Sequence, residues 1–108
     1  MKNIAGLLLI LRPRPLSPTV RAWREVDLDA LRHNAAVLQA VLSPGQKLMA
    51  VVKADAYGHG DVATAKTIQQ AGVAGFAVSS LGEGHHLRHH GITIPILILG
   101  YADPAHAA

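Results

Sequence analysis

A lysine, a tyrosine and two glycines follow one apolar run and carry most of the chemical interest of this sequence. The run ends at Val52, and Lys53 comes directly after it. Tyr57, Gly58 and Gly60 lie within the next seven residues. An amine at the end of a buried strand is partly desolvated, which favours its neutral, nucleophilic form. The spacing therefore indicates an amine that is presented to a ligand.

The residues after the lysine are suited to a phosphate group. Gly58 and Gly60 let the backbone approach a ligand closely or take a positive φ. A helix predicted from Asp61 would add N–H groups and the positive end of its dipole, and Tyr57 could donate its hydroxyl to a phosphate oxygen. A solvent-reaching lysine, a loop aromatic and two ordinary turn glycines explain the same residues equally well.

Strands and helices alternate around this segment. Strands are predicted at 21–26, 47–54, 76–79 and 95–100, and helices at 28–42, 61–71 and 82–90. Asp27 is the expected N-cap of the first helix, and Gly72 and Gly91 are the expected stops of the other two. Apolar strands separated by helices imply a parallel sheet, either a closed barrel or an open doubly wound sheet. The active site of such folds lies at the carboxyl ends of the strands, where Lys53 is expected.

Composition narrows the classes of function. The net charge is +3, but five of the ten Lys and Arg residues precede the first acidic residue, Glu25, so the rest of the chain is mildly acidic. No basic stripe with interleaved aromatics occurs, and we predict no nucleic-acid partner. The absence of cysteine excludes disulfides and thiolate metal sites.

Residues 1–18 differ from the remainder. Their apolar run, 4–11, is shorter than the roughly 20 residues needed to span a bilayer. Proline-rich sequence follows it in place of a signal-peptide cleavage site. We predict a disordered extension over 1–18, a folded part over 19–108, a cytoplasmic protein and no membrane partner.

Other polar residues have simpler explanations. Two pairs of histidines at i, i+4 spacing on the third helix could bind a divalent metal, but two ligands on one exposed helix make a weak site. We predict a solvated face and no metal centre there. His59 is expected to bond to local backbone, Asp55 to stabilise a turn, and Glu83 and Arg88 to be surface residues of the helix. The histidines are His85, His86, His89 and His90.

Residues 50–60, AVVKADAYGHG, resemble the pyridoxal-phosphate attachment segment of alanine racemases. Residues 21–34, RAWREVDLDALRHN, resemble the opening strand and helix of that family, and 91–100, GITIPILILG, resemble its third barrel strand. The resemblance extends over about 19–104.

The resemblance implies pyridoxal phosphate as cofactor and alanine as substrate. Lys53 would hold the cofactor and act as the base on one face of the substrate, and Tyr57 would bind the cofactor phosphate. In this family a tyrosine from the C-terminal β domain of a partner subunit supplies the second acid or base, which implies a homodimer. The product, D-alanine, would serve bacterial cell-wall synthesis.

The implied fold is part of a (β/α)₈ TIM-type barrel. Such barrels take about 250 residues, so these 108 would supply the first three or so βα units, without the C-terminal β domain. We therefore expect a fragment of an N-terminal barrel domain that is nearly inactive alone. A racemase of serine or another small amino acid, a non-catalytic cofactor-binding protein and an inactive truncated product remain as alternatives.

Overall fold

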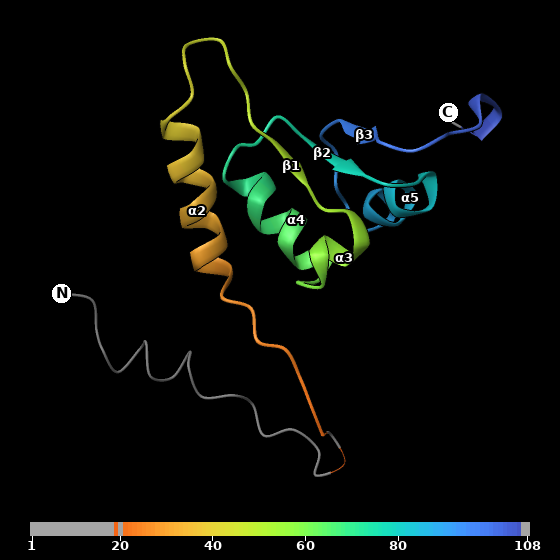
Figure 1. Cartoon of the computed structure of the whole chain (residues 1–108), viewed down its shortest axis with the longest axis horizontal. Coiled ribbons are helices and arrows are strands. Elements are labelled where there is room, and N and C mark those ends of the chain that lie inside the picture. Colours follow the sequence, from red (N-terminus) through yellow and green to blue (C-terminus); the bar gives the residue numbers. More distant parts are fainter. Residues whose placement is uncertain (1–18, 20, 107–108) are drawn as a thin grey trace.

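Three strands alternate with helices in the computed structural model, which describes residues 19 and 21–106 (Figure 1). The predicted extension over 1–18 lies outside the described residues. The strands are β1 (Met49–Val51), β2 (Gly75–Val78) and β3 (Ile96–Ile98). The helices are α2 (Leu28–Ala40), α3 (Lys53–Tyr57), α4 (Asp61–Gln70) and α5 (Leu81–His89), with a 3₁₀ turn η1 (Pro104–His106).

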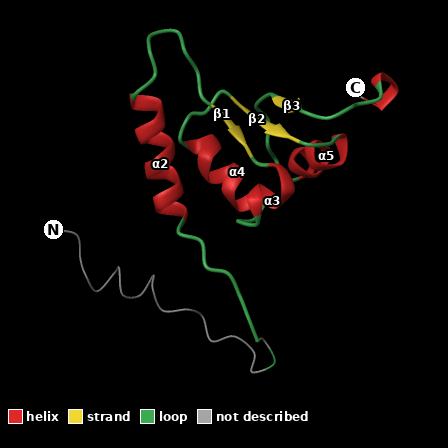
Figure 2. Ribbon diagram, viewed as in Figure 1, coloured by secondary structure: helices red, strands yellow, loops and turns green. Residues whose placement is uncertain are grey.

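The strands form one parallel sheet in the order β1-β2-β3, which confirms the predicted architecture (Figure 2). Val51 lies opposite Ala77, and Ala77 lies opposite Leu97. Because the strands run in the same direction, their carboxyl ends meet at one edge of the sheet. Lys53 follows β1 at that edge, and Ser79 follows β2.

The core lies on one side of the sheet. Phe76 and Val78 of β2 are fully buried there, in one cluster with Ala65 of α4 and Leu87 of α5. Side chains alternate along a strand, so the neighbouring positions point to the opposite face. That face exposes large apolar side chains on both outer strands, Met49, Val51 and Leu97.

Helices α2, α4 and α5 begin within one residue of their predicted starts, whereas α3 was not predicted. The side chain of Asp27 accepts a hydrogen bond from Ala30 N–H at 3.0 Å and caps α2. Helix α2 packs against α4, which lies next to α3. None of the described helices combines the length and hydropathy needed to cross a bilayer.

Two strand predictions are wrong. Residues 21–26 form no strand, because the segment runs away from the sheet and meets no described strand that could share its backbone hydrogen bonds (Figure 1). The strand predicted over 47–54 is shortened to Met49–Val51. The chain leaves the sheet after Val52, so Lys53 belongs to α3 and not to a strand.

Candidate functional site

Lys53 begins a left-handed turn at the carboxyl edge of the sheet. The Val52 N–H still bonds to Ala77 O in the neighbouring strand, at 2.9 Å. The next four residues after Lys53, from Ala54 to Tyr57, then all take positive φ, between 51° and 57°. For residues with a Cβ this conformation costs roughly 1–2 kcal/mol each, so surrounding contacts must hold it. We call residues 53–60 the lysine turn.

Backbone hydrogen bonds close the lysine turn on itself. Ala56 N–H bonds to Val52 O at 3.0 Å, and Gly60 N–H bonds to Asp55 O at 2.9 Å. Gly58 and Gly60 have φ of +87° and +94°, which confirms that these glycines supply the positive φ expected of them.

The Asp55 side chain, within the turn, and the Arg24 side chain, from the segment before α2, stabilise the turn. One carboxylate oxygen of Asp55 accepts from Asp61 N–H at 2.9 Å, and the other accepts from Arg24 Nη1 at 2.9 Å. Arg24 Nη1 also donates to Gly58 O at 2.7 Å. The Asp61 N–H, followed by the Arg24 guanidinium, lowers the pKa of Asp55 below its ordinary value. The turn-stabilising role predicted for Asp55 is confirmed, whereas the contribution of Arg24 was missed.

Glu83 is the second residue that sequence reasoning missed. Its Oε1 accepts from Ala54 N–H at 2.8 Å and its Oε2 accepts from Ser79 N–H at 2.6 Å. The Ala54 N–H is the largest cause of a lowered pKa of Glu83, with smaller contributions from Ser79 and Ser80. The prediction of a plain surface residue is therefore wrong. A Ser80-x-x-Glu83 pattern, typical of a capping box, was the available signal.

The functional groups of Lys53 and Tyr57 are left free for a ligand. Lys53 is half-buried and Tyr57 is 61% exposed. No described residue forms a hydrogen bond or ion pair with the Lys53 amine or the Tyr57 hydroxyl. An unpaired amine suits an aldehyde carbon, and a phenol suits a phosphate oxygen. The residues present therefore fit pyridoxal phosphate at the lysine turn.

The first turn of α4 has fewer N–H groups available for an anion than the sequence indicates. The Asp61 N–H bonds to the Asp55 carboxylate, and the Val62 N–H bonds to the Asp61 carboxylate at 2.7 Å. Two carboxylates thus already use two of the N–H groups expected to attract a phosphate. Thr64 N–H bonds to Gly60 O at 3.1 Å. The Tyr57 hydroxyl is a further candidate phosphate contact at the lysine turn.

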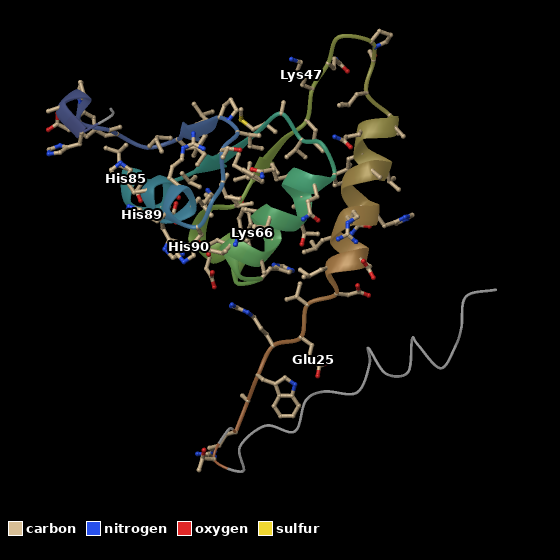
Figure 3. All side chains as sticks on the ribbon, turned by 180° about the vertical axis from the view of Figure 1, so that it is seen from behind. Glu25, Lys47, Lys66, His85, His89 and His90 are labelled. Atoms are coloured by element: carbon tan, nitrogen blue, oxygen red, sulfur yellow. The ribbon has the colours of Figure 1, made fainter. Side chains whose placement is uncertain are left out.

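The histidines of α5 form an exposed face, as predicted. Figure 3 shows His85, His89 and His90 along this helix. The ring centroids of His86 and His90 lie 4.5 Å apart, and His86 Nε2 is 3.5 Å from Asp61 Oδ1. Among the described residues no group of three or more potential ligands is arranged to hold a metal ion. In the lysine turn, His59 Nδ1 lies 3.0 Å from Ala56 O, which confirms a local backbone contact.

Acid should loosen the lysine turn, because Asp55 and Glu83 both have a lowered pKa in the folded chain. Their ordinary values are 3.8 and 4.5. Above about pH 5 both groups are ionised in the folded and the unfolded chain, so their full contribution to stability is present. As the pH falls below these values, the unfolded chain takes up protons first and stability declines. We expect urea midpoints that are flat from pH 7 to about 5 and fall below it.

Glu83→Gln should show a shallower decline than the wild type, because it removes one of the two groups. Asp103→Asn, which deletes a carboxylate far from the lysine turn in sequence, is the matched control and should follow the wild-type curve. Equal slopes for Glu83→Gln and the wild type would contradict this assignment.

Comparison with known proteins agrees with the fold. The model of the family described as "Alanine racemase, N-terminal domain" matches residues 26–108. An alanine racemase of a Nostoc species is 58% identical over 80 residues, which are 74% of this chain and 21% of that protein. A serine/alanine racemase of Enterococcus gallinarum is 45% identical over 93 residues, which are 86% of this chain and 13% of that protein.

Solved structures give the same result. An alanine racemase of Clostridium difficile superposes with a TM-score of 0.75 at 45% identity, covering 81% of this chain and 23% of that one. The enzyme of E. faecalis gives a TM-score of 0.71 at 42% identity, with coverage of 75% and 22%. The chain spans about a fifth of the length of the curated alanine racemases it matches. By sequence and by structure, it belongs to the alanine racemase family, and its parallel βα units match part of that family's N-terminal barrel domain.

Proposed function

We propose that this chain carries the cofactor-binding lysine of an alanine racemase, which interconverts L- and D-alanine with pyridoxal phosphate bound at Lys53. The observation that carries the proposal is the half-buried Lys53, whose amine has no partner among the described residues and which opens the left-handed lysine turn. Relatives named alanine racemase support the substrate. Supply of D-alanine to the cell wall, in the cytoplasm, is the biological role that we infer.

Lys53 has two tasks under this proposal. Its amine holds the cofactor, and when free it takes or returns the α-proton on its own face of the amino acid. Pyridoxal phosphate, when bound, supplies an electron sink for the negative charge that develops at the α-carbon. The lysine turn fixes the backbone at Lys53, so that the amine is oriented before the substrate arrives.

Tyr57 and a partner subunit complete the proposed site. The Tyr57 hydroxyl donates a hydrogen bond to the cofactor phosphate from the far end of the left-handed turn. Racemisation also needs an acid or base on the opposite face of the substrate. We assign that group to the partner subunit of a homodimer, as the resemblance to the family implies.

A broader substrate range is the second candidate. The relative named serine/alanine racemase supports it, because it aligns over 86% of this chain. Parallel assays with L-alanine and L-serine separate the two candidates. Exchange of the α-proton of L-serine at a rate comparable with that of L-alanine would favour the broader range.

Reductive trapping tests the cofactor assignment directly. The full chain is incubated with pyridoxal phosphate, reduced with borohydride, digested and mapped by mass spectrometry. We expect the label at Lys53 in clear excess over Lys47, in the loop before β1, and Lys66, on α4 (Figure 3). Equal labelling of the three lysines would overturn the proposal. Label at Lys53 supports attachment of the cofactor whether or not the alanine α-proton exchanges in deuterated water, because the group on the opposite face is assigned to the partner subunit.

Tyr57→Phe should weaken binding of pyridoxal phosphate without preventing attachment. A hydrogen bond to a charged group contributes about 1.5–3 kcal/mol, so we expect the dissociation constant to rise roughly tenfold to a hundredfold. Titration followed by absorbance measures this constant. Tyr101→Phe is the matched control, since Tyr101 is 88% exposed and lies beyond β3. Equal affinities of the two variants would remove Tyr57 from the site.

A further inference from the structure

The hydrogen-bond ladder between β1 and β2 opens at the lysine turn. Val52 N–H bonds to Ala77 O, as the register requires. If the parallel ladder continued, Ser79 N–H would donate to Val52 O and Ala54 N–H would donate to Ser79 O. Instead, Val52 O accepts from Ala56 N–H at 3.0 Å, and Ser79 O accepts from Gly100 N–H at 3.1 Å. Both N–H groups that would have extended the ladder are thereby left without their strand partners.

The Glu83 carboxylate takes both of these donors. Oε1 accepts from Ala54 at 2.8 Å and Oε2 accepts from Ser79 at 2.6 Å. In an ordinary capping box the glutamate returns to the N–H of the cap residue itself. Here Ser80 caps α5 by accepting from Glu83 N–H at 3.3 Å, and the Glu83 carboxylate extends beyond the cap residue to the two strand ends. The carboxylate therefore lies between β1 and β2 where the two strands separate.

The position of this contact couples it to Lys53. The peptide unit that contains the Ala54 N–H also contains the Lys53 carbonyl, so anchoring it fixes ψ of Lys53 and the start of the left-handed turn. If the ladder closed, β1 would extend through Lys53 and the left-handed turn could not begin at Ala54. Helix α5 holds the carboxylate in place, because Glu83 lies in its first turn.

We propose that Glu83 is a positioning residue whose carboxylate keeps the β1–β2 ladder open beyond Val52 and so orients Lys53 for its aldehyde ligand. The effect on the ligand rests on the proposed function, whereas the effect on the backbone does not. A carboxylate is required because both of its oxygens accept. The amide of glutamine would direct an NH₂ group at one of the two N–H donors.

Two measurements on the full chain test this proposal. Amide hydrogen exchange followed by NMR reports on the backbone, and reductive trapping with pyridoxal phosphate reports on Lys53. In Glu83→Gln we expect exchange at Ala54 and Ser79 to accelerate at least tenfold while Phe76, in the middle of the sheet, keeps its protection. The ratio of label at Lys53 to label at Lys66 should fall at least fivefold. A merely structural role would not change this ratio in a chain that remains folded.

Control variants make each outcome decisive. His85→Ala, an exposed position on the same helix, should match the wild type in both measurements. Protection of Phe76 shows that each variant remains folded, and Glu83→Ala repeats the test without a new NH₂ group. Exchange at Ala54 within twofold of the wild type, or an unchanged labelling ratio, would overturn the proposal. If the wild type takes no label at Lys53 while Ala54 exchange accelerates in Glu83→Gln, the proposed function fails and the open ladder is upheld.

Discussion

Lys53→Met should abolish covalent attachment of pyridoxal phosphate to this chain while leaving its fold intact. Methionine has a similar length but no amine, so the bond to the cofactor aldehyde cannot form. No described residue pairs with the Lys53 amine, so removing it breaks no hydrogen bond or ion pair among the described residues. We therefore expect a change in unfolding free energy within about 0.5 kcal/mol. After borohydride reduction, mass spectrometry should find no label at position 53, and any α-proton exchange should fall to background.

Two further substitutions serve as controls. One tests whether a positive charge at position 53 is sufficient, and the other tests whether the loss of any lysine has the same effect. Lys53→Arg keeps a positive charge but cannot form the bond, so it should behave like Lys53→Met. Lys66→Met, at an exposed position on α4, should keep the wild-type label at Lys53. If Lys53→Met retained the wild-type amount of label, the cofactor would be attached elsewhere and the proposed function would be wrong.

The alternation of apolar strands and helices could be predicted because it depends on local patterns. The apolar spacing that buries one side of a helix and the glycine that ends it both involve residues close together in sequence. The bounds of α2, α4 and α5 accordingly lie close to the predicted ones. The strand predicted over 21–26 shows the limit of this reasoning. A strand needs a partner backbone as well as a suitable sequence, and no described strand lies beside that segment.

The lysine turn could be predicted only in part. Gly58 and Gly60 signalled positive φ, but the four preceding residues that share it carry side chains. Local backbone hydrogen bonds close the turn, but no local sequence signal predicts positive φ for residues with a Cβ, and contacts from distant segments also hold it. Arg24 reaches Asp55 across 31 positions, and Glu83 reaches Ala54 across 29. Such pairings depend on the tertiary fold, which single-sequence patterns do not specify.

The N–H groups at the start of the helix at Asp61 are less available than the sequence indicates, for a related reason. The spacing of glycines and the start of a helix were read correctly from the sequence. The sequence also contains the competing acceptors, the carboxylates of Asp55 and Asp61. It does not show that these carboxylates lie within hydrogen-bond distance of the first N–H groups of the helix. A carboxylate within a few residues of a helix start can satisfy the N–H groups that would otherwise attract a ligand.

Phe76→Ala should cause the largest loss of stability among single substitutions in the sheet. Phe76 is 0% exposed, lies in the central strand and belongs to the cluster that includes Val78 and Leu87. Truncating a buried phenylalanine costs about 3–5 kcal/mol, and a domain of this size has a total of roughly 5–15 kcal/mol. Urea unfolding followed by circular dichroism should show a much lower midpoint.

Leu97→Ala is the matched control, because Leu97 is 49% exposed on the other face of the same sheet. We expect it to cost only about 1 kcal/mol. The loss in Phe76→Ala should also reach the lysine turn, since Val52 and Ala54 are held by bonds to Ala77 of β2 and to Glu83. Labelling at Lys53 should therefore decline in Phe76→Ala and persist in Leu97→Ala. Equal losses of stability in the two variants would mean that the core does not lie on the helix-covered side, and the support that β2 gives to Lys53 would need another source.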